Sequence, residues 1–360
     1  MKTLKKSLEV LQKTAKERTV KTQTIEYDLE TIVKKIQRET IKLNPDYQRK
    51  HRWKIDASSR LIESLILNIP IPFIYISQDV DVDDEVKDDI ARFSVIDGQQ
   101  RLTAIYEFFK NEYPLTGLEV LDDLNGSYYN DLPPFLIRRL EERSIPCLRI
   151  DSTVDEQVKY DIFERLNSGS VKLEPQELRN ATCRGPFKEL IKKLAKDERF
   201  KRLTNITEES SRVEKMEDEE LILRYFAITY NDGYRDYKGG FKKFLTQKMT
   251  ELNKKDNNEL LKMESNFNKT LSAIDAVFSE LPFAKYRFAN GELKAMSKFN
   301  ASVYDSVMYL FNRVVILGVN ITEDSVRDLF KNPDFFSACE GSVNDVNKLK
   351  TRITTAIHLL

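Results

Sequence analysis

The sequence predicts an α+β fold, in which a small mixed sheet with helices in the first half of the chain is followed by an all-helical C-terminal domain. Strand-like segments are confined to the first half and alternate there with helical patterns, whereas the second half has almost none. Charged residues make up 32% of the 360 residues, against roughly 25% in typical domains, and there are only 11 Gly and 11 Pro. Many charges with few turn-forming residues indicate helices with solvated faces.

The first elements are a basic arm and a helix. Residues 1–24 carry seven Lys/Arg against two Glu, with leucines at the spacing of a short amphipathic helix. From Asp28, which stands where a helix N-cap would, apolar residues recur at helical spacing as far as Arg38. Asn44-Pro45 then breaks the pattern, because the residue before a proline avoids the helical region.

Residues 25–185 hold the strand signals and are predicted to form the α+β domain. A helix is predicted from Asp56 and is stopped by Pro70 and Pro72. Short apolar and aromatic runs predict buried strands at 73–76, 93–96 and 145–150, the acidic segment 79–89 predicts a solvated excursion, and helices are predicted after residue 101 and at 133–143 and 154–166. Residues 186–360 are predicted to form the helical domain, with helices at 187–195, 217–230, 241–252, 260–281, 299–317, 325–330 and 343–359.

The composition excludes several classes of protein. The 58 Lys/Arg balance the 58 Asp/Glu, so no global field draws the chain to nucleic acid or to an anionic membrane. The three Cys lie far apart without a CxxC pair, which excludes a disulfide framework and a zinc ribbon, and the two His are too few for most His-rich metal sites. No apolar run approaches the roughly 18 residues that span a bilayer, so we expect a soluble, cytoplasmic protein without a membrane partner.

The most informative segment is Asp97-Gly98-Gln99-Gln100-Arg101, here called the DGQQR turn, which lies between a predicted strand and a predicted helix. A helix N-terminus binds anions, and Gly98 allows a close approach of the backbone and a positive φ. Arg101 offers a bidentate donor for phosphate. Gln99 and Gln100 are suited to orient water or to bind a base or ribose, and Asp97 is suited to hold a divalent ion. The structural alternative is a capping box between Asp97 and Gln100.

Two other polar segments could contribute to the same site. Arg49 in Tyr47-Gln48-Arg49, together with Trp53, could reach a shared cleft, although a surface Arg beside a core Tyr explains the pattern equally well. A polar turn and helix follow later in the chain, with Asn167-Ser168-Gly169, Glu177, Arg179 and Asn180. Pro175 and Glu177 also fit an ordinary helix start.

Taken together, five motifs resemble the N-terminal domain family of GmrSD-type restriction enzymes, which belongs to the ParB/sulfiredoxin-like superfamily. In chain order they are Tyr47-Gln48-Arg49, Leu61-Ile62-Glu63-Ser64, Ile69-Pro70-Ile71-Pro72, Asp97-Gly98-Gln99-Gln100-Arg101-Leu102 and Phe163-Glu164-Arg165-Leu166-Asn167-Ser168-Gly169. The resemblance covers about residues 25–185 and follows the order of the family's motifs. It implies a compact ParB/sulfiredoxin-like core in which the DGQQR turn binds a nucleoside triphosphate.

The resemblance also implies roles for individual residues. Gly98, Gln99, Arg101 and Arg49 would bind the nucleotide, and Asp97 and Gln100 would be catalytic, with Asp97 holding Mg²⁺. Tyr47, Gln48 and Asn167 would be accessory residues.

The activity implied is NTP hydrolysis coupled to the restriction of foreign or modified DNA. The partners implied are a nucleoside triphosphate, DNA, and a separately encoded nuclease or defence subunit. Two alternatives remain open: a non-enzymatic sensor that binds DNA or a partner through the same core, and a nuclease that acts through the DGQQR turn itself, which would need further carboxylates near Asp97.

The chain has too few histidines for the nuclease motif of many relatives, and its two basic segments allow two interpretations. His51 and His358 cannot supply the His-Asn-His nuclease motif that many relatives carry, so we expect no nuclease activity of that kind. Residues 184–202 carry eight Lys/Arg against three acids, and residues 1–24 are also basic. Both segments fit either contact with DNA phosphates or solvated helix faces.

Overall fold

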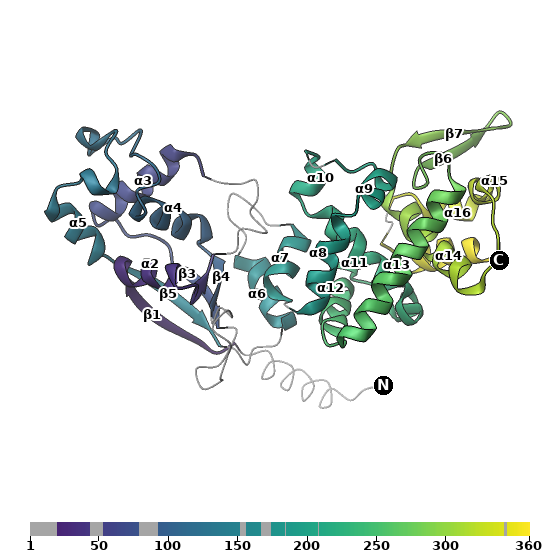
Figure 1. The fold of residues 1–360 in the computed structure, drawn as a ribbon, viewed down its shortest axis with the longest axis horizontal. Helices are drawn as coiled ribbons and strands as arrows, with labels where there is room; N and C mark the ends of the chain where they lie inside the picture. Colours follow the sequence, from purple (N-terminus) through teal and green to yellow (C-terminus); the bar gives the residue numbers. More distant parts are fainter. Residues whose placement is uncertain are drawn as a thin grey trace, which may run out of the picture. The chain divides into compact units, whose positions relative to one another are not determined.

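The computed structural model describes residues 20–43, 53–78, 93–151, 156–166, 174–183, 185–207, 209–341 and 344–360. The chain divides into two compact units, Met1–Leu173 and Glu174–Leu360, each considered by itself (Figure 1). Within the described ranges, no helix is both long and apolar enough to cross a membrane.

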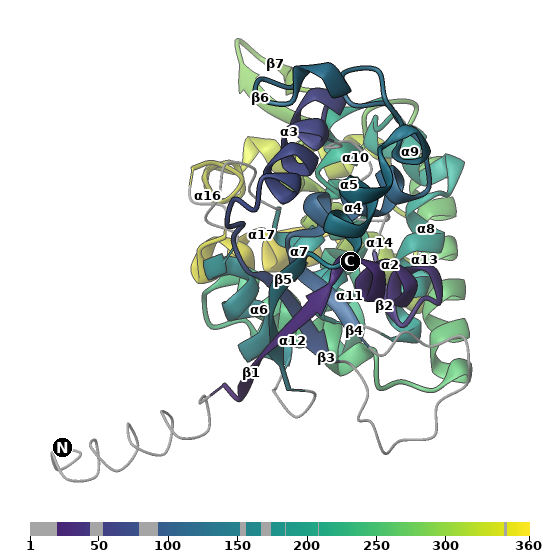
Figure 2. The ribbon, with the colours of Figure 1, turned by 90° about the vertical axis from the view of Figure 1, so that its left-hand side faces the viewer.

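The first unit is built on a mixed five-stranded sheet with the order β1-β5-β3-β4-β2. Its strands are β1 (Thr22–Asp28), β2 (Ile41–Lys42), β3 (Ile74–Gln78), β4 (Phe93–Asp97) and β5 (Ser144–Ile150). β5 pairs antiparallel with β1 and parallel with β3, while β4 pairs antiparallel with β3 and parallel with β2. β1 leads directly into the first described helix (Figure 2).

The described helices of the first unit are α2 (Leu29–Gln37), α3 (Ile55–Ile66), α4 (Gln99–Phe109), α5 (Pro134–Glu141) and α6 (Glu156–Leu166), with short 3₁₀ turns η2 (Asp122–Leu124) and η3 (Tyr129–Asp131). Helices α2 to α5 share one hydrophobic core with the sheet. α2 begins where the sequence predicts, because Oδ1 of Asp28 accepts the backbone N–H of Thr31 at 2.6 Å. Ile74 and Ile76 of β3 point into the same core as Leu102 and Ile105 of α4. The strand before the turn and the helix after it are both anchored in this core, which fixes the turn between β4 and α4.

The predicted α+β class is confirmed, and so are the three predicted strands. Two strands of the first unit, β1 and β2, were not predicted. β1 begins at Thr22, so the last residues of the predicted basic arm form an edge strand that pairs with β5. Its sequence is polar and its side chains are mostly exposed or half-buried, so it lacks the apolar pattern of a buried strand. Residues 1–19 and the acidic segment 79–89 lie outside the described residues.

The second unit is mainly helical, as predicted. Its helices are α7 (Pro175–Thr182), α8 (Pro186–Ala195), α9 (Glu198–Thr204), α10 (Ser211–Glu214), α11 (Glu217–Thr229), α12 (Phe241–Leu252), α13 (Asn257–Val277), α14 (Ala301–Leu317), α15 (Glu323–Asp328), α16 (Pro333–Ala338) and α17 (Val346–Ile357), with 3₁₀ turns η4 (Tyr230–Asp236) and η5 (Leu329–Lys331). α14 is buried along most of its length and packs against α11, α13 and α17. It is the central helix of this unit.

A β-hairpin corrects the prediction of an all-helical second domain. β6 (Lys285–Ala289) and β7 (Glu292–Ser297) pair antiparallel and are joined by Asn290-Gly291 (Figure 1). Both turn residues have positive φ, 55° and 84°, as a tight two-residue hairpin turn requires. An Asn-Gly pair between apolar and aromatic residues is a strong hairpin signal, so the sequence contained the information that the helical prediction missed.

Candidate functional site

The DGQQR turn connects the end of β4 to the start of α4 through a glycine that no other residue could replace without strain. Gly98 has φ 91° and ψ 12°, in the left-handed region. A Cβ at this position would lie 2.4 Å from Cδ1 of Ile74 and 3.0 Å from Nη2 of Arg101. The backbone of the turn therefore lies directly against the sheet and against the arginine that follows it.

Arg101 folds back over this glycine and ties the turn to the segment before β3. Its Nη2 donates to Oδ2 of Asp97 at 2.9 Å and to the carbonyl of Phe73 at 3.2 Å, and its Nη1 donates to the carbonyl of Pro72. The Arg101 side chain is 11% exposed and that of Asp97 is 45% exposed. A half-exposed carboxylate thus holds a nearly buried guanidinium where β4 ends.

The structural alternative of a capping box is wrong. The N-cap of α4 is Gly98, which makes no side-chain cap hydrogen bond, and the Asp97 carboxylate bonds to Arg101 instead of to the first backbone N–H groups. Asp97 is therefore the counter-ion of Arg101, which leaves the N-terminal turn of α4 without an acidic cap from this residue.

Burial and charge act in opposite directions on the pKa of Arg101. Burial lowers the pKa of the guanidinium, and the nearby Asp97 carboxylate raises it, with burial the larger effect. Burial also raises the pKa of Cys147, on the neighbouring strand β5, to about 12. This thiol is protonated at neutral pH and is not a nucleophile there.

The two glutamines of the turn have different surroundings. Gln99 is buried, so its side chain belongs to the interior rather than to an open site. Gln100 is half-buried, and its Oε1 accepts the backbone N–H of Trp53 at 3.1 Å. The contact brings the start of α3 to the first turn of α4. Of the two glutamines, Gln100 is the one placed to meet a ligand.

Several predicted site residues lie outside the described residues. They are Tyr47, Gln48 and Arg49 before α3, and Asn167 after α6. Within the part of the chain that the structure describes, no three His, Cys, Asp or Glu side chains gather as a metal-binding group. A role for Asp97 in holding Mg²⁺ stays a prediction.

The polar residues of α7 connect this helix to α11. The fully buried Arg179 donates from Nε to Oε1 of Gln176 at 2.7 Å and from Nη2 to Glu220, and Asn180 donates to Oε2 of Glu219 at 2.6 Å. Glu177 accepts the backbone N–H of Glu174 at 2.6 Å in a capping box. These contacts favour the structural interpretation of this segment over a ligand-binding one.

The basic segment at residues 184–202 is largely neutralised by acids. Lys193 pairs with Glu264 at 2.5 Å, and Lys201 with Glu198 at 2.9 Å. Arg202 forms a bidentate pair with Asp275, both contacts being 2.9 Å. These pairs favour a mixed-charge helix surface rather than a row of cations for DNA phosphates.

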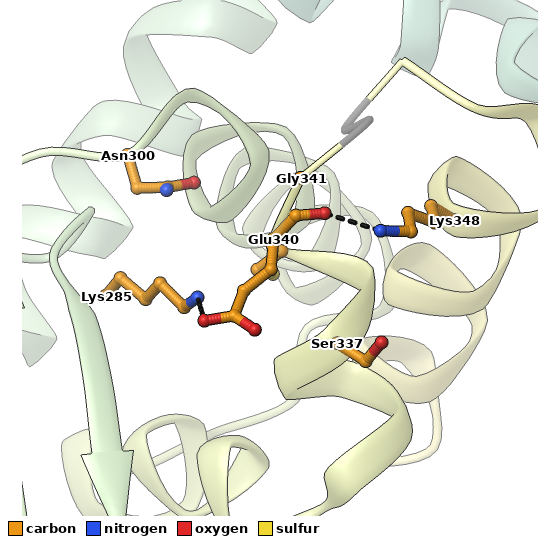
Figure 3. A pocket seen from close by; sticks show the side chains of 7 residues that line it. Lys285, Asn300, Ser337, Glu340, Gly341 and Lys348 are labelled. Atoms are coloured by element: carbon orange, nitrogen blue, oxygen red, sulfur yellow. Dashed lines mark hydrogen bonds and ion pairs between the residues drawn. The ribbon is translucent and has the colours of Figure 1, made fainter.

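A hollow of about 710 Å³ in the second unit was not indicated by any sequence motif. Lys285 pairs with a carboxylate oxygen of Glu340 at 2.6 Å, and Lys348 donates to the backbone carbonyl of the same residue at 2.5 Å (Figure 3). The Lys285 ammonium also lies 4.1 Å from the centre of the Phe336 ring. The two lysines therefore fix Glu340 between α16 and α17.

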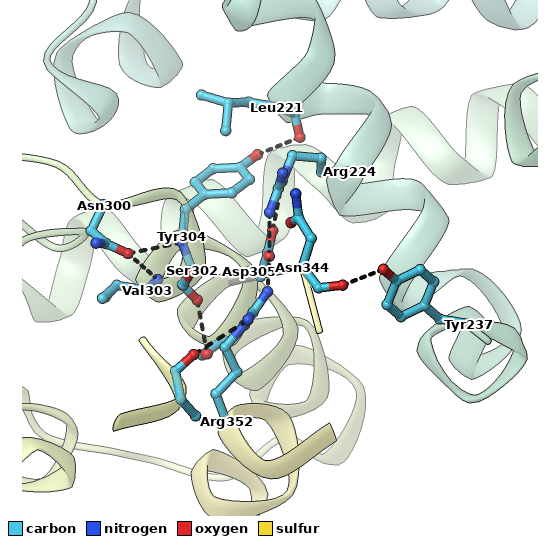
Figure 4. A network of polar contacts seen from close by, with 12 residues as sticks. Leu221, Arg224, Tyr237, Asn300, Ser302, Val303, Tyr304, Asp305, Asn344 and Arg352 are labelled. Atoms are coloured by element: carbon cyan, nitrogen blue, oxygen red, sulfur yellow. Dashed lines mark hydrogen bonds and ion pairs between the residues drawn. The ribbon is translucent and has the colours of Figure 1, made fainter. Parts of the chain in front are cut away.

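The core of the second unit contains a buried charge network (Figure 4). Asp305 of α14 accepts from Nε and Nη2 of Arg224 on α11 at 3.0 and 2.6 Å, and from Nη2 of Arg352 on α17 at 2.6 Å. Arg224 also stacks on Phe241, with its guanidinium carbon 4.4 Å from the ring centre. One carboxylate thus joins three helices.

Comparison with protein-family models identifies the part of the chain that contains the DGQQR turn. Residues 29–183 match the model described as "GmrSD restriction endonuclease, N-terminal domain". The matched range runs from α2 to α7 and contains β2 to β5. No curated protein matches the chain.

Proposed function

Residues 29–183 belong to the GmrSD restriction endonuclease N-terminal domain family, and we propose that this domain binds a nucleoside triphosphate at the DGQQR turn and hydrolyses it. Membership of the family indicates a part in a restriction-type defence system. The finer statement, that NTP turnover takes place at this turn and serves the restriction of foreign DNA, is our proposal. DNA and a separately encoded nuclease or defence subunit are its expected partners.

The observation that carries the proposal is the geometry of the turn. The first N–H groups of any α-helix have no acceptor within the helix, and the N-terminus is the positive end of the helix dipole. Gly98 brings this N-terminus close to the sheet, and Arg101 places a cation at its base. Backbone donors and a guanidinium in one place are the groups that hold phosphate in proteins.

Asp97 and Gln100 are the residues that we propose to act in turnover. Mg²⁺ in nucleotide sites is commonly held by one or two carboxylates together with phosphate oxygens and water, so the half-exposed Asp97 carboxylate fits such a set. The ion would supply charge neutralisation at the phosphates. Gln100 would orient the attacking water, because positioning and charge stabilisation supply most of the catalysis in phosphoryl transfer. Arg49, Tyr47, Gln48 and Asn167 stay as predicted contributors.

The binding step is tested with Arg101→Ala. Loss of a charge-assisted bidentate contact should weaken NTP binding by on the order of 2 kcal/mol, roughly thirty-fold in Kd. Calorimetry gives Kd, and circular dichroism checks the fold, because Arg101 also holds the segment before β3. Arg60→Ala is the matched control, since Arg60 forms an exposed pair with Glu119 on the same unit. Unchanged NTP affinity in a folded Arg101→Ala variant contradicts the proposed site.

The catalytic step is tested with Asp97→Asn and Gln100→Ala. Both variants should keep most of the binding and lose phosphate release, measured with each of the four NTPs and Mg²⁺, with and without DNA. Variants that bind and turn over NTP like the wild type would show that these two residues are not catalytic.

A sensor without turnover is the second candidate. The observation in its favour is that Arg101 and Asp97 already pair with each other, so that a phosphate would have to share or displace an existing contact. Exchange of Arg101 contacts at the N-terminus of α4 could couple ligand binding to the Pro72–Phe73 segment. Absence of phosphate release from every NTP, despite measurable binding, would favour the sensor. Among the described residues no carboxylate cluster supports a nuclease at the DGQQR turn.

A further inference from the structure

Two exposed aromatic side chains flank the DGQQR turn. Trp53 is 37% exposed and Phe73 is 40% exposed, although such side chains are usually buried. Trp53 lies two residues before the start of α3, and Phe73 lies after this helix. Both residues are bonded to the turn through their backbones, Trp53 by its N–H to Gln100 at 3.1 Å and Phe73 by its carbonyl to Arg101 at 3.2 Å. The turn therefore fixes the backbone positions from which both rings are presented.

The surroundings of the two rings distinguish them. Phe73 lies against Tyr75, with ring centres 6.5 Å apart. For Trp53, no ring contact is recorded among the described residues, and its indole offers the largest π-face that a side chain can present. A base stacks on such a face with little regard to its identity, because every base has a π-face. Of the two aromatic residues, Trp53 is the better platform.

The position of Trp53 also fits the length of a nucleotide. A ribose separates the base from the phosphates, so a base subsite has to lie beside the phosphate subsite without overlapping it. The Trp53 backbone contacts the side chain of Gln100, which belongs to the first turn of α4, where we place the phosphates. We infer that Trp53 is the residue on which the base of the bound nucleotide stacks. This inference rests on the proposed function of the DGQQR turn.

The experiment separates the base from the phosphates. ATP contains both, whereas inorganic tripolyphosphate contains only the phosphate chain, and calorimetry gives Kd for each. In Trp53→Ala, the affinity for ATP should fall roughly ten-fold or more, as for other base-stacking residues, while the affinity for tripolyphosphate should stay unchanged. Trp53→Phe should restore most of the ATP affinity. Phe135→Ala is the control, because Phe135 is another exposed aromatic residue of the same unit, on α5.

An independent signal comes from the tryptophan itself. The chain contains one Trp, so its fluorescence reports on this position alone. In the wild type, ATP should quench the emission and tripolyphosphate should leave it nearly unchanged. Both measurements use the full chain.

Each outcome decides a different question. If the wild type binds ATP and tripolyphosphate but Trp53→Ala binds ATP normally, the stacking inference is overturned and the proposed site stands. If Trp53→Ala weakens both ligands equally, Trp53 supports the turn rather than the base, and the inference is again overturned. If the wild type binds neither ligand, the proposed function fails and the inference fails with it.

Discussion

The chain contains two arginine–aspartate clusters whose chemistry is alike and whose surroundings differ. At the DGQQR turn, Asp97 is 45% exposed and pairs with one arginine, whereas Asp305 is fully buried and pairs with Arg224 and Arg352. Burial lowers the pKa of Arg101 more than Asp97 raises it. For Arg224 burial is again the largest single effect and lowers the pKa, but Asp305, together with Glu220 and Tyr304, outweighs it, and the pKa ends above its usual value.

The comparison shows what makes an ion pair ready for a ligand. In the buried network, the carboxylate accepts three hydrogen bonds from two helices, so its oxygens are used within the core. At the turn, the Asp97 carboxylate remains accessible on one side and the helix N-terminus lies next to it. We therefore expect the Asp97–Arg101 pair to exchange partners with an anion from solution, and the Asp305 network to serve only to hold helices together.

The sharpest test of this difference is the same substitution in both clusters. Asp305→Asn should destabilise the second unit by about 3–5 kcal/mol, because it leaves two buried guanidinium groups without a counter-charge. Asp97→Asn should cost less than about 1 kcal/mol, as expected for a pair that is partly open to solvent. Hydrogen exchange measures each unit separately. Equal losses in the two variants would remove the distinction between the clusters.

A second test concerns the close approach at the turn. Gly98→Ala should destabilise the first unit by roughly 1–3 kcal/mol and loosen the Arg101 contacts, because it combines a positive φ with an overlap against Ile74. Gly126→Ala is the matched control, since Gly126 has φ 90° but no atom within 4 Å of its would-be Cβ. The difference between their unfolding free energies in urea isolates the overlap. A control that is as destabilised as Gly98→Ala would show that φ alone matters.

The last test concerns a carboxylate in the protein interior without an arginine partner. The pKa of Glu177 is raised to about 7, because burial raises it more than the backbone N–H of Glu174 lowers it, and the Glu174 carboxylate adds a smaller rise. The folded state therefore binds the proton more tightly than the unfolded chain, so stability is highest below the unfolded pKa of about 4.3 and falls as pH rises towards 7.

Glu177→Gln should remove this pH dependence and keep the capping hydrogen bond through its amide oxygen. Above pH 7 the variant should be more stable than the wild type by roughly 3 kcal/mol, because each unit of difference between the folded and unfolded pKa corresponds to about 1.4 kcal/mol. Urea unfolding at several pH values between 5 and 8 gives the comparison. Parallel curves for the two proteins would contradict the raised pKa.

Most local elements could be predicted from the sequence, whereas contacts between distant residues could not. The β6–β7 hairpin is the local exception, because its Asn290-Gly291 turn was overlooked. The strand, turn and helix around Gly98 follow from consecutive residues, so the turn was predicted correctly. The partners of Arg101 at Pro72 and Phe73 lie 29 and 28 positions earlier, and no local pattern announces them. The network of Asp305 joins residues 81 and 47 positions away, for the same reason. β1 was missed because an edge strand needs no apolar alternation.

The position of β5 in the sheet has a consequence for how the protein is made. β5 is the last strand of the first unit in the sequence, yet it lies between β1 and β3, and Thr22 pairs with Ile150. During synthesis β1 and β3 leave the ribosome without the strand that joins them, and pairing between distant segments is slow. The DGQQR turn is therefore synthesised well before its sheet can close. Until then, the edges of β1 and β3 that β5 will cover have no partner strand, and unpaired strand edges are prone to aggregation.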